Sequence, residues 1–143
     1  YGPYDNFDHT TSHVVPGLIS KIHKAKTHGD KEYLVWGSGT PLRELLYSKD
    51  LVRAIEVVLK DKVSNFDIIN IGSGTEISIK NLASHIKEVV GFKGKLKFDE
   101  SKPDGVNRKI LDSSKIKSLD WEPKTTLQEG LETTYKWFLN NEK

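Results

Sequence analysis

The stretch WGSGTPLRELLYSKDL, residues Trp36–Leu51, decides the fold because it joins the end of a strand, a glycine-rich turn and the start of a helix. The β-prone residues 33–36 form a continuous apolar run, which predicts a strand buried on both faces. Gly37-Ser38-Gly39 then ends the strand, because glycine and serine are common turn residues. Ser48 is expected to cap a helix that carries Asp50 in its first turn, where the helix dipole favours a carboxylate. A strand followed so closely by a helix predicts a mixed α and β fold.

Length and composition predict one globular domain over residues 1–143. The 143 residues match the commonest domain size, and 36% of them are hydrophobic, which is enough to fill one core. The 22 basic and 20 acidic residues are interleaved along the chain, so no basic block predicts binding to nucleic acid. The sequence pI of about 8.7 nevertheless suits an anionic ligand.

The chain has no cysteine, which excludes disulfides, thiolate metal sites and a cysteine nucleophile within it. Its first residues lack the basic and apolar segments of a signal peptide, and no apolar run reaches the roughly 20 residues that span a bilayer. These features predict a cytoplasmic protein without a membrane partner. The chain starts without methionine, at the turn Gly2-Pro3, so we expect further sequence upstream.

Apolar residues at helical spacing predict four helices. The first follows Ser12, which is expected to cap it, and the third runs from Ser78 to a stop at Gly91. The last begins at a capping box formed by Thr126 and Glu129. The expected buried faces are, in chain order, Val15, Leu18, Ile19 and Ile22; Leu51, Ile55, Val58 and Leu59; Ile79, Leu82, Ala83, Ile86 and Val90; and Leu127, Leu131, Tyr135 and Phe138.

Further segments complete the expected fold. Ile68–Ile71 is apolar and precedes the loop Gly72-Ser73-Gly74, so it is expected to be the strand of a strand-loop-helix unit. Residues 95–98 alternate as in a half-buried strand, and residues 101–107 form a loop with proline and glycine. Residues 110–119 predict a strand or turn that leads into a short helix. The fold class is therefore α/β (mixed α+β), with about four helices and short strands.

The sequence Gly72-x-Gly74 imitates a dinucleotide-binding loop, because it lies between an expected strand and an expected helix. The third glycine of G-x-G-x-x-G is absent, since Ile77 stands there. We therefore expect a plain loop and no pyrophosphate site. No Walker, zinc-protease, nucleophile-elbow or calcium-loop motif occurs, and the 5 histidines are scattered, so no metal site is expected. By spacing alone, the chain contains no complete active site.

Two single residues have positions that can serve a ligand. His13 lies at a helix start, where an imidazole can titrate near neutral pH, although an exposed or capping histidine is the commoner case. Arg43 lies just beyond the glycine turn. Its guanidinium can bind an anion or form a structural salt bridge with Glu44 or Asp50, and the residues alone leave both interpretations open.

Three more residues also have two interpretations each. Tryptophan is most often a core residue, but at the end of a strand the ring of Trp36 can stack on the flat or apolar face of a ligand. Asp104 and Lys109 lie on either side of Gly105 and are by default solvated loop charges. Spacing alone assigns none of the three to a site.

Five motifs are similar, in their order, to those of the GDP-L-fucose synthase family, NADPH-dependent epimerase/reductases among the extended short-chain dehydrogenases. They are YGPYDNF (1–7), SHVVPGLI (12–19), VWGSGTPLRELLY (35–47), INIGSG (69–74) and VVGFKGKLKFDESKPDGVNRKILD (89–112). The resemblance extends through the terminal WFLNN and covers essentially the whole chain. It implies that residues 1–143 are the C-terminal, GDP-sugar-binding portion of such an enzyme.

The resemblance assigns roles to individual residues. His13 matches a general acid/base beside the nicotinamide end of the cofactor, so it is expected to be both catalytic and cofactor-binding. Acid/base chemistry fits the epimerisation that the resemblance implies, because a 4-keto group acidifies the sugar protons at C3 and C5. Arg43 and Lys109 are expected to neutralise the diphosphate. Trp36 is expected to wall the ligand, and Asp104 to accept hydrogen bonds from its sugar or base.

Lys21 matches a further substrate-binding position, where the family can also have arginine. It lies on the helix that follows His13 and outside the apolar face, so it is expected to reach the same cleft. The lysine keeps the charge of an arginine and loses its bidentate hydrogen bonding.

The family's Rossmann domain, with its NADP loop, its Ser-Tyr-Lys residues and its catalytic cysteine, has no counterpart in this chain. NADP is therefore expected to be bound mainly by an absent N-terminal domain, and the isolated chain to be inactive. The resemblance also implies a homodimer, formed largely through that domain. Two other interpretations stay open: another nucleotide-sugar epimerase or dehydratase with the same architecture, and a non-catalytic nucleotide-sugar-binding or interaction module.

Overall fold

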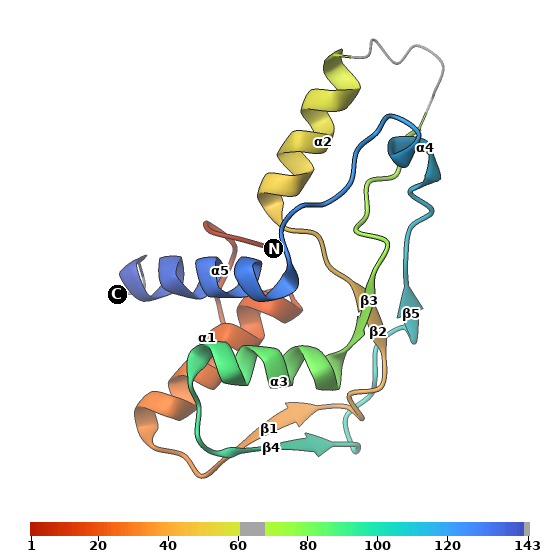
Figure 1. The fold of residues 1–143 in the computed structure, drawn as a ribbon. Helices are drawn as coiled ribbons and strands as arrows, with labels where there is room; N and C mark the ends of the chain where they lie inside the picture. Colours follow the sequence, from red (N-terminus) through yellow and green to blue (C-terminus); the bar gives the residue numbers. More distant parts are fainter. Residues whose placement is uncertain (61–67, 142–143) are drawn as a thin grey trace.

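The computed structural model describes residues 1–60 and 68–141, in which five helices and five short strands are arranged as in Figure 1. The helices are α1 (Val14–His28), α2 (Ser48–Lys60), α3 (Ile79–Val90), α4 (Ser114–Lys117) and α5 (Leu127–Asn141). The strands are β1 (Glu32–Trp36), β2 (Leu42–Glu44), β3 (Glu76–Ser78), β4 (Lys95–Asp99) and β5 (Arg108–Lys109). The predicted mixed α and β class is confirmed. Within these residues, each helix is too short or too polar to cross a membrane.

The main core lies between α1, α3 and α5, with β1 beside them (Figure 1). α1 packs on α3, and α3 packs on α5. The apolar faces predicted for these three helices form this core, and several of their residues are completely shielded from solvent: Ile19, Ile22, Leu82, Ile86 and Leu131. Each such side chain contributes about 1.5–3 kcal/mol relative to an exposed one.

Both ends of α3 and the start of α5 are those predicted from the sequence. Ser78 caps α3, because its Oγ accepts a hydrogen bond from the N–H of Asn81 at 3.2 Å, and Gly91 ends the helix in the left-handed conformation at φ 74°. At α5, the N–H of Thr126 donates to Oε2 of Glu129 at 2.9 Å, and the N–H of Glu129 donates back to Oγ1 of Thr126 at 3.3 Å. The predicted capping box is therefore confirmed.

The start of α1 differs from the prediction that Ser12 caps it. His13 is the N-cap residue, since its carbonyl accepts the first helical hydrogen bond, from the N–H of Gly17 at 3.0 Å. Ser12 lies one position too early, where its own N–H donates to the carbonyl of Asp8 at 3.2 Å. Its hydroxyl covers Gly17 instead, and a Cβ there would come within 2.6 Å of Oγ.

Only Val58 of the face predicted for α2 is partly buried, where it packs against a second apolar cluster, and the covered side of the helix is shifted from the predicted one. Three residues of the predicted face are largely exposed: Leu51 40%, Ile55 46% and Leu59 74%. The buried residues of α2 are Asp50 and Ala54, and Ala54 packs with Ile116 and Trp121 in this second, smaller cluster. Seven of the 13 residues of α2 are apolar, and they extend around the helix beyond the side that packs on Trp121, so the contact with Trp121, and not the periodicity alone, decides which side is covered.

The strands form two small sheets. β1 pairs in parallel with β4, while β2 is the middle of three strands, antiparallel to β3 and parallel to β5. The prediction that β1 is buried on both faces is wrong, because Val35 is 4% exposed whereas Leu34 and Trp36 are 49% and 73% exposed. Figure 1 shows β1 and β4 at the margin of the fold, with α1 and α3 on one side of them.

Residues 68–71 are not the strand that was predicted. Within the described residues no neighbouring strand pairs with them, and the strand of this region is β3, beyond the glycine loop. The strand-loop-helix prediction is therefore wrong in its first element. β3 instead runs directly into α3. The strand predicted over residues 95–98 is confirmed as β4 and the short helix within residues 110–119 as α4, while β5 lies just before that range.

Candidate functional site

A cleft with a volume of about 520 Å³ lies along α1 and beside β1. Its walls include His13 at the start of α1, Lys21 in the middle of this helix and Trp36 at the end of β1. The structure thus brings three of the predicted site residues to one cleft. One face of α1 provides this wall, since residues spaced by three or four lie above one another on a helix.

His13 has a side chain that is available to a ligand. Its carbonyl takes part in the first turn of α1, but its imidazole makes no capping hydrogen bond and is exposed. Capping by the side chain, one of the two ordinary roles of such a histidine, is therefore excluded, although the backbone of His13 occupies the N-cap position. The imidazole stands at the edge of the cleft, where it can exchange a proton with a bound molecule.

The cleft has a basic wall. Lys21, Lys24 and His28 line it from α1, and Asp30 lines it with an opposite charge. Lys21 is half-buried there, whereas Lys24 and His28 are exposed. Burial also raises the pKa of Tyr33, on the other side of the cleft, above its usual value of 10.0, so this phenol stays neutral. An anionic ligand suits this balance of charge.

Trp36 is not a core residue, because its side chain is 73% exposed at the end of β1. The Nζ of Lys102 lies over its ring, 5.8 Å from the centroid. A cation at this distance is attracted by the ring face. The indole therefore has one side near a lysine of the loop 101–107 and also lines the cleft.

The glycine turn after β1 is bound to Asp104. Gly37 and Gly39 both have left-handed φ values, 84° and 78°, that only glycine adopts without strain. Between them, Ser38 donates two hydrogen bonds to the Asp104 carboxylate: its N–H to Oδ1 at 2.9 Å and its hydroxyl to Oδ2 at 2.6 Å. No local sequence pattern indicates this role of Ser38, because its partner lies 66 positions away.

Arg43 is held by two carbonyl oxygens. Its Nη1 donates to the carbonyl of Leu42 at 2.7 Å and to that of Val106 at 2.6 Å. In the described residues it forms no ion pair with Glu44 or Asp50, so the salt bridge considered from the sequence is wrong. The half-buried guanidinium is thus positioned while its charge keeps no acidic partner among these residues.

Arg43 and Lys109 are neighbours in the sheet. They are directly paired across the parallel strands β2 and β5. Paired residues of adjacent strands project from the same face, so two positive side chains leave one face of this sheet together. Two adjacent cations are well suited to the two phosphates of a nucleotide sugar.

Glu44 joins two distant loops, a role that the sequence did not indicate. Its Oε1 accepts a hydrogen bond from the N–H of Gly74 at 2.6 Å, and its Oε2 accepts one from the N–H of Leu111 at 3.0 Å. A Cβ on Gly72 would come within 2.5 Å of Oε1. The loop 72–74, which is similar to a dinucleotide-binding loop, therefore binds the carboxylate of Glu44 at the place where such a loop would bind a phosphate.

The six predicted residues fall into two connected groups. One group lines the cleft along α1: His13, Lys21 and Trp36. The other group lies around the glycine turn and β5: Arg43, Asp104 and Lys109. The loop 101–107 connects them, because it contacts Trp36 through Lys102 and Arg43 through Val106.

Comparison with known proteins supports the relation seen in the motifs. Residues 1–72, about half of the chain, match the NAD dependent epimerase/dehydratase family. Probable GDP-L-fucose synthase 1 of Oryza sativa subsp. japonica is 52% identical over 141 residues, which are 99% of this chain and 43% of that protein.

Solved structures share the fold. A GDP-L-fucose synthetase from Naegleria fowleri bound to NADP superposes with a TM-score of 0.87 at 34% identity, over 99% of this chain and 44% of that one. UDP-glucose 4-epimerase with UDP-glucose from Thermotoga maritima superposes with a TM-score of 0.79 at 28% identity, over 100% of this chain and 44% of that one. The chain spans less than half the length of each of these relatives. From the match of residues 1–72 and the similarity along its whole length, the chain belongs to the NAD dependent epimerase/dehydratase family.

Proposed function

We propose that the chain is the GDP-sugar-binding part of an NADPH-dependent enzyme that converts GDP-4-keto-6-deoxy-D-mannose to GDP-L-fucose. The reaction would consist of epimerisation at C3 and C5 and then reduction at C4. The observation that carries the proposal is the 52% identity to a probable GDP-L-fucose synthase over 99% of the chain.

Arg43 and Lys109 would bind the diphosphate of the substrate. Both leave one face of the β2–β5 pair, and Arg43 is fixed by two carbonyl oxygens and has no acidic partner in residues 1–60 and 68–141. A charge-assisted hydrogen bond to phosphate is stronger than a neutral one. Lys21 would add a third positive charge from α1, and the exposed ring of Trp36 would wall the ligand.

His13 would act as a general acid/base in the epimerisation. The 4-keto group acidifies the protons at C3 and C5, so one group removes a proton and another returns one to the opposite face. The exposed imidazole at the edge of the cleft can perform one of these transfers. The resemblance implies that the second group is a cysteine. This chain has no cysteine, so the second group would belong to a part of the enzyme outside it.

NADPH, when bound, would supply the hydride for the reduction at C4. The chain offers this cofactor His13 at the cleft, but its glycine loop at residues 72–74 is filled by the carboxylate of Glu44. We therefore infer that the cofactor is held mainly outside the chain, and that the isolated chain does not oxidise NADPH. The homodimer implied by the resemblance and the cytoplasmic location expected from the sequence stay predictions.

The proposal is tested with the full-length polypeptide that contains this chain. Supplied with NADPH and GDP-4-keto-6-deoxy-D-mannose, it should oxidise NADPH and form GDP-L-fucose, as identified by NMR of the product. The 143-residue chain alone should turn over no NADPH and bind the GDP-sugar at most weakly, because it spans only 43% of the length of the related GDP-L-fucose synthase. Turnover by the chain alone would contradict the division of roles.

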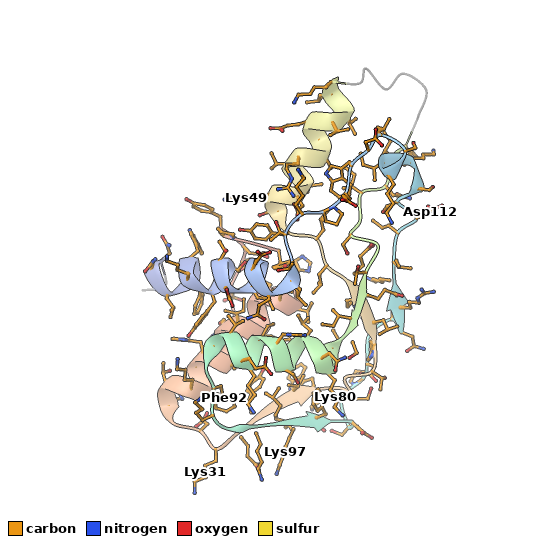
Figure 2. All side chains as sticks on the ribbon, in the orientation of Figure 1. Lys31, Lys49, Lys80, Phe92, Lys97 and Asp112 are labelled. Carbon is orange, nitrogen blue, oxygen red and sulfur yellow. The ribbon has the colours of Figure 1, made fainter. Side chains whose placement is uncertain are left out.

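Two variants test the diphosphate contact. Arg43→Gln in the full-length polypeptide should weaken GDP-sugar binding roughly tenfold or more, because a charge-assisted bond to phosphate is lost. Lys97→Gln is the matched control, since Lys97 forms an ion pair with Glu32 at 2.7 Å and points away from the body of the molecule (Figure 2). Equal loss in both variants would show a general effect of charge and not a contact with phosphate.

Another nucleotide-sugar enzyme of the family is the second candidate function. The similarity to UDP-glucose 4-epimerase, with a TM-score of 0.79, favours it, because one architecture serves different sugars. A screen of GDP-, UDP- and dTDP-sugars on the full-length polypeptide separates the candidates. Preferred binding of a UDP- or dTDP-sugar would replace the proposed substrate, and binding without turnover of any of them would favour a non-catalytic module.

A further inference from the structure

We infer that Ser38 is a positioning residue for the substrate site. It holds the loop 101–107 against the glycine turn through Asp104, and the loop in turn holds the side chains that meet the ligand. The inference rests on the proposed function, because the ligand in question is the GDP-sugar.

Both oxygens of the Asp104 carboxylate are directed at Ser38. The backbone N–H and the hydroxyl of Ser38 reach Oδ1 and Oδ2 at 2.9 and 2.6 Å. Gly37 permits this approach, because a Cβ on it would overlap Oδ1 of Asp104. We call this pair of hydrogen bonds, between Ser38 and Asp104, the 38–104 latch.

The 38–104 latch lies between two contacts of the same loop with site residues. On one side, Lys102 stands over the ring of Trp36 at 5.8 Å. On the other side, the carbonyl of Val106 accepts a hydrogen bond from Arg43 at 2.6 Å. Lys102, Asp104 and Val106 follow one another along the loop in the same order as their partners Trp36, Ser38 and Arg43. The 38–104 latch therefore positions the loop for both other contacts.

A second copy of the same tetrapeptide shows what is special about Ser38. Residues 37–40 and 72–75 both have the sequence GSGT. In both copies the serine bonds locally to the threonine two positions later: Ser38 to Thr40 at 2.7 and 3.1 Å, and Ser73 to Thr75 at 3.3 Å. Only Ser38, of these two serines, also bonds to a carboxylate on a distant loop.

The latch gives Asp104 a role that differs from the direct contact expected from the sequence. Its carboxylate is held by Ser38, and the carbonyl of Val106 on the same loop accepts a hydrogen bond from Arg43. Loss of the latch should release the loop and disturb Arg43 and Trp36 together. The effect should fall on substrate affinity and not on the chemical step, because neither Ser38 nor Asp104 lies among the residues that line the cleft with His13.

The experiment uses the full-length polypeptide with the variants Ser38→Ala, Asp104→Ala and the double variant. Ser38→Ala should raise KM for the GDP-sugar roughly fivefold with kcat unchanged, as for the loss of one exposed charge-assisted hydrogen bond. The double variant should match Asp104→Ala alone, because both changes break one connection. Ser73→Ala is the matched control and should leave KM unchanged.

Hydrogen exchange measured by mass spectrometry gives a readout that needs no turnover. Amides of residues 101–107 should exchange faster in Ser38→Ala and at the wild-type rate in Ser73→Ala. If the rise in KM of the double variant equals the product of the rises in the two single variants, the inference is overturned, since Asp104 would then act on the ligand independently of Ser38. Unchanged exchange in Ser38→Ala would overturn it as well. Absence of turnover in the wild type would instead reject the proposed function, while the exchange experiment would still decide about the latch.

Discussion

The buried carboxylate of Asp50 accepts a hydrogen bond from the backbone N–H of Thr125 at 3.1 Å, although 75 positions separate the two residues. The N–H of Lys124 donates to the same carboxylate at 3.3 Å, and Arg53 forms an ion pair with it. Asp50 thereby fastens α2 to the segment that leads into α5. The helix dipole accounts for an acidic residue in this first turn, but only the tertiary contact accounts for its complete burial.

Asp50→Ala should lower the free energy of unfolding by about 2–4 kcal/mol, because two backbone N–H groups and Arg53 lose their buried partner. Urea denaturation measures this change. Glu56→Ala is the matched control, since Glu56 is an exposed acidic residue of the same helix, and it should change stability by less than about 0.5 kcal/mol. Equal midpoints for the two variants would mean that Asp50 has no such role.

Gly37→Ala should cost more stability than Gly29→Ala, although both glycines have left-handed φ values, 84° and 72°. At Gly29 nothing lies within 4 Å of an added Cβ, so only backbone strain of about 1 kcal/mol is expected. At Gly37 the added Cβ would also meet the Asp104 carboxylate. Thermal unfolding compares the two, and a Gly29→Ala variant that is at least as damaged would contradict the steric argument.

Thr126→Ala should destabilise the fold by about 1 kcal/mol, because the start of α5 loses its side-chain acceptor. The control is Thr133→Ala, in which the hydroxyl that donates to the carbonyl of Glu129 at 2.8 Å is lost from an exposed site inside the same helix. Chemical denaturation of both variants is the measurement. A larger loss at Thr133 would argue against the capping box.

Arg108→Ala should raise the pKa of Glu76 toward its ordinary value of 4.5. Two hydrogen bonds of 2.7 Å from Arg108 hold the pKa of this carboxylate below that value, and the same contact raises the pKa of Arg108. Carbon-13 NMR titration of the Glu76 carboxyl group measures the change. A titration midpoint that does not move would show that Arg108 is not the cause.

The same contact predicts a pH dependence of stability. Because the pKa of Glu76 is lower in the folded than in the unfolded chain, its contribution is fully present above pH 4.5 and is lost as the pH falls through the lowered pKa. Glu76→Gln should remove this part of the acid dependence, as followed by the unfolding midpoint at several pH values. A variant with the same acid dependence as the wild type would contradict the assignment.

His13→Gln in the full-length polypeptide should suppress solvent deuterium incorporation at C3 and C5 of the substrate by roughly 100-fold, the usual scale for loss of a general acid/base. GDP-sugar affinity should stay similar, because the diphosphate contacts are elsewhere. His85→Gln, at an exposed position of α3, is the control. Unchanged exchange in His13→Gln would remove this residue from the proposed acid/base role.

Sequence patterns for helix capping were sufficient to predict both ends of α3 and the start of α5. Ser78, Gly91 and the Thr126–Glu129 pair act within one turn of the helix they begin or end, so the sequence predicts them directly. The same patterns failed for Ser12, because a backbone bond to Asp8 moves the start of α1 by one residue. The strand pattern failed for residues 68–71, since a strand exists only where another strand pairs with it.

The candidate site also has one part that the sequence predicts and another part that only the structure shows. The resemblance supplied the six residues, and the helical repeat of α1 explains why Lys21 reaches the cleft that His13 also lines. The bonds of Ser38 to Asp104, and of Glu44 to Gly74, cross 66 and 30 positions of sequence and carry no local signal.

By itself, then, the sequence determined the helices with a single apolar face, their caps and the family to which the chain belongs, because these depend on neighbours within a few residues or on matching motifs. Only the tertiary structure decided which side of α2 is covered, that Trp36 is exposed, and that Arg43 bonds to the loop 101–107 and, among the described residues, to no carboxylate. Those outcomes depend on which distant segments come into contact, and burial and hydrogen-bond partners are fixed only when the chain has folded.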